Sequence, residues 1–406
     1  MLTAQPPLAV MQLTRNLDIG GAQETARTLA KYLPRVGCPT VVCSFGDGPL
    51  RREIEQSGVP VELLADRHHS VVAFPWFLVE MIRRRRDLLN VVAKHRADVV
   101  QTQGLGTLDF LVMTLGIGRK LQVWWTIQNA KFMVREEHLP RYKFLLGPKR
   151  AAHRWLYRAG ARIVKGIVVV SDETAASFRE VVGDVEGKVA VVANAVDVES
   201  YPSTVDREEV RARLGFGPAD HVMTMVGTFK RQKGHRYLIR ATAEVAPRWP
   251  QLHIVLVGDG ELRPAIEAQV EEAGVAHRVH FLGSRRDVPE LLAASDSFVL
   301  PSLWEGLSVA LVEAMASKLP VIATAVSGTS QVVVDGVTGW LVPPADPTSL
   351  ARVMTELMSD PARAARMGAA GRERVAASFS AQAQAEQLVA LFRSEASVEQ
   401  RMVGRS

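Results

Sequence analysis

The stretch VLPSLWEGLSVALVEAMA, residues 299–316, determines how this sequence is interpreted. A short apolar strand ends at Leu300, a polar loop follows, and a helix is predicted to begin near Ser308. The first turn of a helix offers N–H groups and the positive end of a dipole, which suit a phosphate. Glu305 and Glu313 are separated by about 12 Å along a helix axis, so one carboxylate can face a sugar while the other reaches a ribose. Two glutamates at this spacing are also common on solvated helix faces, and the strand and loop around them favour a ligand site.

Outward from this stretch, the chain alternates short β-branched strands with helices. Such strands are typical of a buried parallel sheet. The first half is predicted to hold strands at 8–13, 40–45, 61–64, 98–101, 123–127 and 166–170. The second half is predicted to hold strands at 222–226, 252–257, 279–282, 297–300, 320–323 and 340–342, with helices at 234–246, 261–273, 287–294, 308–317 and 347–358. This pattern predicts two α/β, Rossmann-like, doubly wound domains.

Loss of periodicity near residues 195–220 marks the domain boundary. We expect an N-terminal domain at 1–200, a C-terminal domain at 201–379, and a last helix within 380–406 that packs back on the first domain. Ligands of such sheets bind beyond the carboxyl ends of the strands, so the two sets of loops are expected to face one ligand across a cleft.

Composition and charge exclude several classes of protein. Of the 406 residues, 47% are hydrophobic and 23% are charged, which is ordinary globular composition. The two cysteines, Cys38 and Cys43, form no zinc motif, and together with the absence of a signal peptide or a long apolar run they favour a cytoplasmic protein. Residues 1–205 hold 27 Lys and Arg against 20 Asp and Glu, so the first half carries the positive surface.

Two further loops each follow the first predicted strand of one half of the chain. Gly20 and Gly21 precede a helix and allow close approach of a ligand to the backbone, although a tight turn explains them equally well. The stretch GTFKRQKG, residues 227–234, places three cations before another helix, and it suits a diphosphate or is a solvated basic loop. The spacing of the first loop does not fit the dehydrogenase pattern.

The ordered set of motifs resembles the family 4 retaining glycosyltransferases of the GT-B fold. The resemblance covers nearly the whole chain, and its motifs lie at 20–21, 170–171, 194–197, 227–234, 257–260, 281–283, 301–302, 305–313, 338–339 and 342–344. It implies transfer of a sugar from a nucleoside-diphosphate sugar to a glycan or lipid-linked acceptor, as in the biosynthesis of cell-surface polysaccharide or glycolipid, with retention of configuration, with no cofactor and with no metal.

The resemblance also implies roles for individual residues. Glu305, Lys233 and Gln128 are expected to be catalytic, with Glu305 near the donor sugar hydroxyls and Lys233 on the diphosphate. Glu313 is expected to bind the ribose, and the base is expected near residues 281–285. The expected donor-binding set is Gly20, Gly21, Gly227, Thr228, Arg231, Lys233, Gly283, Arg285, Leu307, Ser308, Val309 and Glu313.

Four positions depart from the family pattern. Thr228 stands where arginine is frequent, with Arg231 in a different register, and Gln128 stands where histidine is common. Gln331 replaces an acidic residue, and Ala195 replaces a glycine. Glutamine can hydrogen-bond a hydroxyl but carries neither charge nor a transferable proton. Two alternatives therefore stay open: a nucleotide-sugar-binding protein with little turnover, and a nucleotide-sugar epimerase.

The basic first half also suggests a partner. Apolar residues 76–78 and 81–82 precede four arginines at 83–86, which indicates an amphipathic helix with a basic C-terminus, and further cations follow at 143–158. The same cations suit an anionic membrane surface, where a peripheral protein gains about 1 kcal/mol per Lys or Arg. No nucleic-acid motif accompanies the charge, so nucleic acid is not an expected partner. His68 and His69 are expected in a surface loop.

Overall fold

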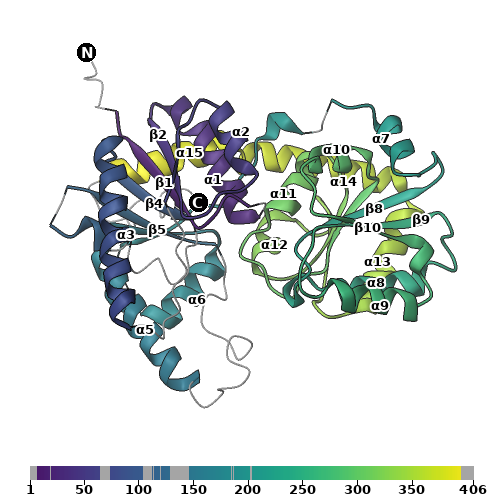
Figure 1. The fold of residues 1–406 in the computed structure, drawn as a ribbon. Helices are drawn as coiled ribbons and strands as arrows, with labels where there is room; N and C mark the ends of the chain where they lie inside the picture. Colours follow the sequence, from purple (N-terminus) through teal and green to yellow (C-terminus); the bar gives the residue numbers. More distant parts are fainter. Residues whose placement is uncertain are drawn as a thin grey trace. The chain divides into compact units, whose positions relative to one another are not determined.

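The computed structural model describes residues 7–18, 20–64, 74–103, 112, 114–118, 120–128, 146–183, 185, 187–201 and 204–394. The chain divides into two units, one comprising Met1–Ala193 with Ala381–Ser406 and the other comprising Asn194–Ser380. The expected boundary after residue 200 therefore lies just inside the second unit. Helix α15 (Ala381–Arg393), shown in yellow in Figure 1, belongs to the first unit and contacts its helix α1 (Gly21–Tyr32).

The first unit contains a parallel sheet in the order β3-β2-β1-β4-β5-β6-β7. Its strands are β1 (Val10–Thr14), β2 (Thr40–Ser44), β3 (Val61–Leu63), β4 (Val99–Gln103), β5 (Gln122–Ile127), β6 (Gly166–Val169) and β7 (Val189–Val191). The predicted doubly wound sheet is confirmed, and β7, which has only three residues, was not among the predicted strands.

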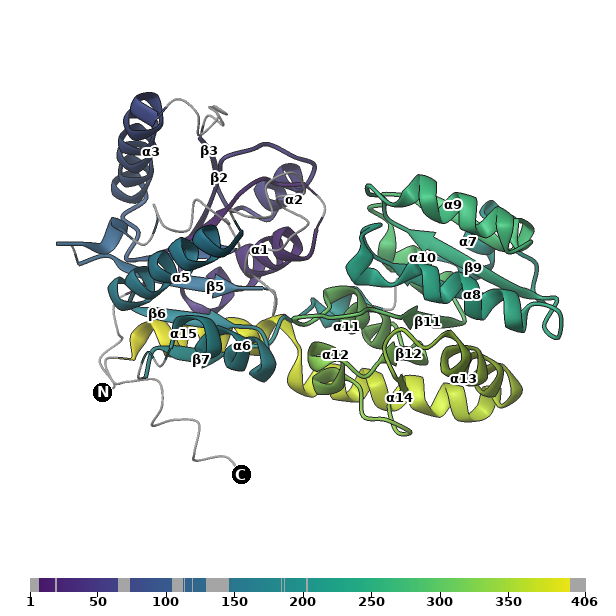
Figure 2. The same cartoon turned by 90° about the horizontal axis from the view of Figure 1, so that it is seen from below.

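Helices cover both faces of this sheet (Figure 2). On one face, α1, α2 (Leu50–Gln56) and α15 pack on the strands, and Phe392 of α15 lies with its ring centroid 5.3 Å from that of Trp124. On the other face, α3 (Phe74–Lys94), α5 (Leu146–Ile163) and α6 (Asp172–Val182) pack around Trp125. Alternate residues of one strand thus serve opposite cores.

The second unit contains a parallel sheet in the order β10-β9-β8-β11-β12-β13. Its strands are β8 (His221–Val226), β9 (Leu252–Val257), β10 (Val279–Gly283), β11 (Ser297–Leu300), β12 (Val321–Thr324) and β13 (Trp340–Val342). Each matches a predicted strand to within one residue at either end, because each is a short run of buried β-branched and apolar residues.

The helices of the second unit include three that the sequence pattern did not predict, α7 (Arg207–Arg213), α12 (Ser327–Val332) and α14 (Pro361–Ser378). The predicted helices are α8 (His235–Val245), α9 (Arg263–Glu272), α10 (Val288–Ala294), α11 (Val309–Ala316) and α13 (Pro347–Ser359). The helix α14 (Pro361–Ser378) contains Gly368 and Gly371, which lower helix propensity. A Cβ at Gly368 would lie 2.1 Å from the carbonyl oxygen of Lys318, so this glycine permits close packing beside α11.

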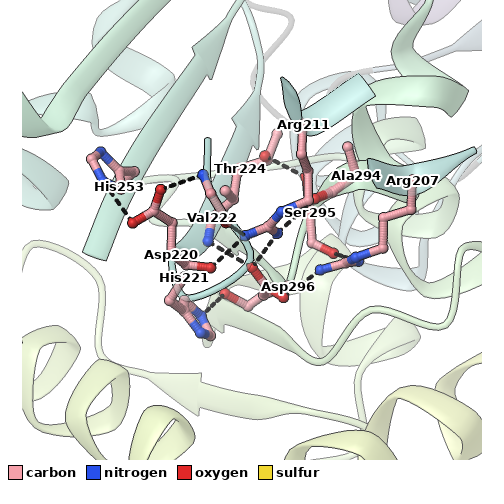
Figure 3. Close-up of polar contacts among 12 residues, drawn as sticks. Arg207, Arg211, Asp220, His221, Val222, Thr224, His253, Ala294, Ser295 and Asp296 are labelled. Carbon is pink, nitrogen blue, oxygen red and sulfur yellow. Dashed lines mark hydrogen bonds and ion pairs between the residues drawn. The ribbon is translucent and has the colours of Figure 1, made fainter. Parts of the chain in front are cut away.

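A partly buried ion-pair cluster lies at the amino ends of strands in the second sheet (Figure 3). Arg211 of α7 (Arg207–Arg213) donates to Asp296 at 2.9 Å and to the carbonyl oxygen of Asp220 at 2.5 Å. Asp296 also accepts from the N–H of Val222 at 2.8 Å. The cluster joins α7 to the starts of β8 and β11, at the opposite end of the strands from the ligand site that this fold class predicts.

Helix α3 corrects one sequence interpretation. The arginines at 83–86 lie in the middle of α3, not at its C-terminus. Arg84 is buried, with its guanidinium carbon 5.5 Å from the centroid of the Phe45 ring. The side chains at 74–81, and the residues His68 and His69, lie outside the described residues. Nothing in the described part of the chain forms a helix that is both long and apolar enough for a membrane span.

Candidate active site

The carboxyl ends of β8, β9 and β11 carry the loops that the sequence singled out in the second unit. Residues 227–234 follow β8, residues 258–260 follow β9, and residues 301–308 lie between β11 and α11. Parallel strands bring these loops to one edge of the sheet. The N–H of Leu303 donates to the carbonyl oxygen of Gln232 at 2.7 Å, so the first and third of these loops are directly bonded.

Lys233 and Glu305 form a buried ion pair at this edge. The Lys233 Nζ lies 2.6 Å from Glu305 Oε1, and only 4% of Glu305 is exposed. The Ser302 hydroxyl donates to the same carboxylate oxygen at 2.6 Å, and Gln232 Nε2 lies 3.4 Å from Oε2. A buried carboxylate requires such partners. The two residues that were expected to be catalytic in this unit are therefore brought together.

Two glycines make this geometry possible. Gly234 has φ +71°, and an added Cβ would lie 2.0 Å from the carbonyl oxygen of Pro301. Gly258 has φ +133°, and an added Cβ would lie 2.2 Å from the carbonyl oxygen of Gly227. A side chain at Gly234 would separate the loop of Lys233 from the segment that leads to Glu305, and one at Gly258 would displace the start of the Lys233 loop.

The helix α11 begins where the sequence predicted. Leu307 and Ser308 are buried before its first residue, Val309, and Asn194 Nδ2 donates to the carbonyl oxygen of Leu307 at 3.2 Å. The N–H groups of a first helical turn have no acceptor within the helix, so this start provides donors for an anion. Glu313 is half-buried on α11, and its Oε1 accepts from the Tyr201 hydroxyl at 3.0 Å.

The remaining expected donor-binding residues of the second unit occupy different environments. Gly227 lies beside the aliphatic stem of Lys233, whereas Thr228 and Arg231 are exposed. Gly283 ends β10 with φ +66°. Arg285 forms a bidentate pair with Asp287 at 2.8 and 2.6 Å, and this pairing raises the pKa of Arg285 and lowers the pKa of Asp287.

His235 adjoins the ion pair but was not a predicted site residue. Its ring stacks on Phe229 with centroids 4.4 Å apart, and its Nδ1 has no hydrogen-bond partner among the described residues. Burial, aided by the nearby Lys233 ammonium, lowers the pKa of His235 to about 4. The imidazole is therefore neutral at pH 7 and adds no charge beside Lys233.

The three remaining expected residues belong to the first unit. Gly20 is the N-cap of α1 in an extended conformation, and Gly21 is the first residue of the helix. A Cβ at Gly21 would meet nothing within 4 Å, so packing of the described residues does not require a glycine there.

Gln128, which is half-buried, ends a chain of hydrogen bonds that continues through buried side chains. Gln128 donates to Gln103 at 2.9 Å, Gln103 donates to Gln12 at 2.8 Å, and Gln12 donates to Gln101 at 2.8 Å. Gln101 then donates to the Thr126 hydroxyl at 3.0 Å. Each amide in this chain has a partner that fixes its orientation.

Two partners of the site were missed by sequence reasoning. Ser302 stands three residues before Glu305, a spacing at which a hydroxyl can reach a glutamate, so the pattern could have indicated this contact. Tyr201 is distant from Glu313 in the sequence, and no pattern indicated their contact. Among the described residues, no group of three His, Cys, Asp or Glu side chains is placed to hold a metal ion.

Comparison with known families and proteins agrees with this architecture. Residues 206–374 match the family described as glycosyl transferases group 1, and residues 19–200 match Glycosyltransferase Family 4. The D-inositol 3-phosphate glycosyltransferase of Corynebacterium urealyticum is 31% identical over 397 residues, which cover 93% of this chain and 91% of that protein. The crystal structure of Anabaena Alr3699/HepE in complex with UDP-glucose is similar with a TM-score of 0.78, 21% identity, and coverage of 94% of this chain and 98% of that one.

Other relatives match over less of their length. The 2-deoxystreptamine glucosyltransferase of Streptomyces kanamyceticus is 33% identical over 238 residues, which cover 56% of this chain. The chain spans 59% of the length of that glucosyltransferase. It spans 63% of the alpha-D-kanosaminyltransferase of the same organism and 46% of an alpha-1,3-galactosyltransferase of Escherichia coli.

Proposed function

We propose that this chain, which belongs to glycosyltransferase family 4, transfers a sugar from a nucleoside-diphosphate sugar to a glycan or lipid-linked acceptor. The observation that carries the proposal is the Lys233–Glu305 pair beside the start of α11. A diphosphate leaving group gains negative charge as the glycosidic bond breaks. A preorganised ammonium and a helix N-terminus stabilise that charge and thereby lower the barrier.

The proposed roles follow from the positions of the side chains. Lys233 and the N–H groups at the start of α11 hold the diphosphate. Glu305, next to Lys233, accepts hydrogen bonds from the donor sugar hydroxyls, and Glu313 binds the ribose hydroxyls. Gln128 of the first unit hydrogen-bonds a sugar hydroxyl. Because Lys233 supplies the cation, we propose that transfer needs no metal, and that excess EDTA leaves the rate unchanged.

A ligand screen tests donor binding. UDP, GDP and ADP are added separately, and the shift in thermal unfolding is measured. A nucleotide at 100 times its dissociation constant stabilises the folded state by about 2.7 kcal/mol. A well-folded sample that no nucleoside diphosphate stabilises would contradict the proposal.

The stereochemical outcome is a separate part of the proposal. We propose that the anomeric configuration of the donor is retained, as the resemblance to retaining enzymes implies. Proton NMR of the glycoside product gives the coupling constant of the anomeric proton on the transferred sugar, which is compared with that of the donor. An inverted product would refute retention while leaving the transferase activity intact.

A binding protein with little turnover is the second candidate. It is favoured by Thr228, which is exposed and uncharged, and by Gln128, which cannot move a proton. Slow release of nucleoside diphosphate from the donor without acceptor supports the enzyme. Tight donor binding with no release at high protein concentration supports the binding protein.

Helix α5 supports a peripheral membrane role in polysaccharide or glycolipid biosynthesis. Its exposed stripe contains Arg154, Trp155, Arg158 and Arg162, and Trp155 is 68% exposed. A tryptophan among cations suits the headgroup region of an anionic bilayer. We expect flotation with phosphatidylglycerol vesicles at low salt, and loss of flotation in Arg154→Glu/Arg162→Glu. Vesicle binding that changes neither with salt nor with the substitutions would show that this surface of α5 does not bind the membrane.

A further inference from the structure

Residues 194–201 are held along helix α11 at both ends. At the start, the Asn194 amide donates to the carbonyl oxygen of Leu307, just before α11, at 3.2 Å. At the end, the Tyr201 hydroxyl donates to Glu313 Oε1 in the middle of α11 at 3.0 Å. These eight residues therefore follow the helix that is proposed to bind the nucleotide.

Tyr201 is fixed by contacts other than the one to Glu313. It is 6% exposed, and its N–H donates to the carbonyl oxygen of Val198 at 3.2 Å. Its carbonyl oxygen accepts from Arg372 of α14, whose Nη1 also donates to the carbonyl oxygen of Ala316 at 2.5 Å. Ala316 is the last residue of α11, where helix geometry leaves carbonyl groups without intrahelical donors. Arg372 thus fastens the Tyr201 backbone to the helix that carries Glu313.

We propose that Tyr201 is a positioning residue that orients the Glu313 carboxylate toward the ribose of the donor nucleotide. A half-buried glutamate on a helix samples several rotamers, and ordering it for a ligand costs entropy. Because the Tyr201 ring is buried, its hydroxyl restricts the rotamers of Glu313 before the nucleotide binds. A carboxylate offers about four lone-pair sites, so a bond from Tyr201 leaves acceptor capacity for the two hydroxyls of a ribose.

This inference rests on the proposed binding of a nucleoside diphosphate. A purely structural role of Tyr201 predicts a different pattern of nucleotide binding. If the hydroxyl only stabilises the second unit, its removal weakens binding of every nucleotide alike. If it orients Glu313, its removal weakens binding only of nucleotides that have ribose hydroxyls.

The test uses the full chain and isothermal titration calorimetry with UDP and 2′,3′-dideoxy-UDP, or with the guanosine or adenosine pair if the screen selects that base. We expect Tyr201→Phe to weaken UDP binding about fivefold, as suits the loss of one typical intramolecular hydrogen bond, and dideoxy-UDP binding less than about twofold. In a Glu313→Ala background, Tyr201→Phe should have no further effect on UDP binding. The donor KM should rise about fivefold while kcat stays within about twofold.

A matched control is Tyr157→Phe, which removes the same atom from a buried tyrosine of the first unit and should change neither affinity. Equal weakening of UDP and dideoxy-UDP binding by Tyr201→Phe, or an undiminished effect without Glu313, would overturn the inference and leave the proposed function standing. A wild-type chain that binds none of the three nucleoside diphosphates would overturn both.

Discussion

The two units place different chemistry at the carboxyl edges of their sheets. In the first unit the hydrogen-bonded side chains near this edge are neutral, in the chain from Gln128 through Gln103 and Gln12 to Gln101. In the second unit they are charged, in the pair Lys233–Glu305. Neutral amides can orient hydroxyl groups without attracting counterions, whereas an ammonium can stabilise a departing diphosphate. The contrast supports the proposal that the second unit binds the leaving group.

Removal of the Lys233 ammonium should have the largest effect. We expect Lys233→Ala to lower the transfer rate by about 10²–10³, the usual consequence of deleting one preorganised donor. Glu305 keeps the bond from Ser302, so circular dichroism should still show a folded chain. The matched control is Lys230→Ala, which removes an exposed cation from the same loop and should keep near wild-type activity. Similar losses in both variants would contradict a specific role for Lys233.

Acid should weaken the second unit through histidines whose pKa is lowered by burial. The pKa of His235 is about 4 in the folded chain, below the ordinary 6.5, so the unfolded chain binds a proton first as pH falls. Its contribution to stability is complete above pH 6.5 and declines toward pH 4, by about 3 kcal/mol in all. Burial also lowers the pKa of His221, His253 and His280, which adds to the same trend.

Urea unfolding at several pH values measures this effect. His235→Phe can keep the stacking on Phe229 but cannot bind a proton, so its stability should fall less steeply between pH 6.5 and pH 4.5. Parallel curves for the variant and the wild type would show that His235 does not contribute. The glutamine chain of the first unit has no titratable group and should give no such dependence.

Interruption of the glutamine chain should have a moderate effect. Gln103→Leu removes the hydrogen bond from Gln128 and the hydrogen bond to the Gln12 carbonyl oxygen, which we expect to lower the free energy of unfolding by about 2 kcal/mol. The matched control is Gln382→Leu at an exposed position of α15 in the same unit. If urea unfolding gives equal, small changes for both, the chain does not stabilise the first unit.

The smallest effect is expected at Arg285. Its guanidinium is paired with Asp287 at a partly exposed position, and such pairs contribute about 0–1 kcal/mol. Arg285→Ala should therefore change the unfolding midpoint little, and calorimetry should show whether nucleotide affinity changes. A large loss of affinity would mean that Arg285 leaves Asp287 to contact the nucleotide, as its place in the expected donor-binding set implies.

The strands were more predictable from the sequence than the site partners. Strands β9 and β11 match their predicted ranges, because a run of apolar residues between turns carries its own signal. Helix α14 was missed since its glycines serve packing against residues 318–319, which no local pattern reveals. Lys233 and Glu305 were each predicted as ligands of a substrate, but their pairing with each other depends on the sheet order. The glutamine chain likewise requires β1, β4 and β5 to be neighbours.

The second unit begins and ends at one place in its own structure. The N–H of Val196 donates to the carbonyl oxygen of Phe379 at 3.1 Å, and Val196 and Ser380 form a parallel bridge. The two points where the chain enters and leaves this unit are therefore adjacent, as in a domain inserted into another. A fragment spanning 194–380 keeps the pairing of Val196 with residues 379–380 and the contacts of Asn194 and Tyr201. A fragment that starts at residue 206 lacks these three residues and their contacts. A short linker that joins residues 194 and 380 would give circular permutants in which the second unit is studied by itself.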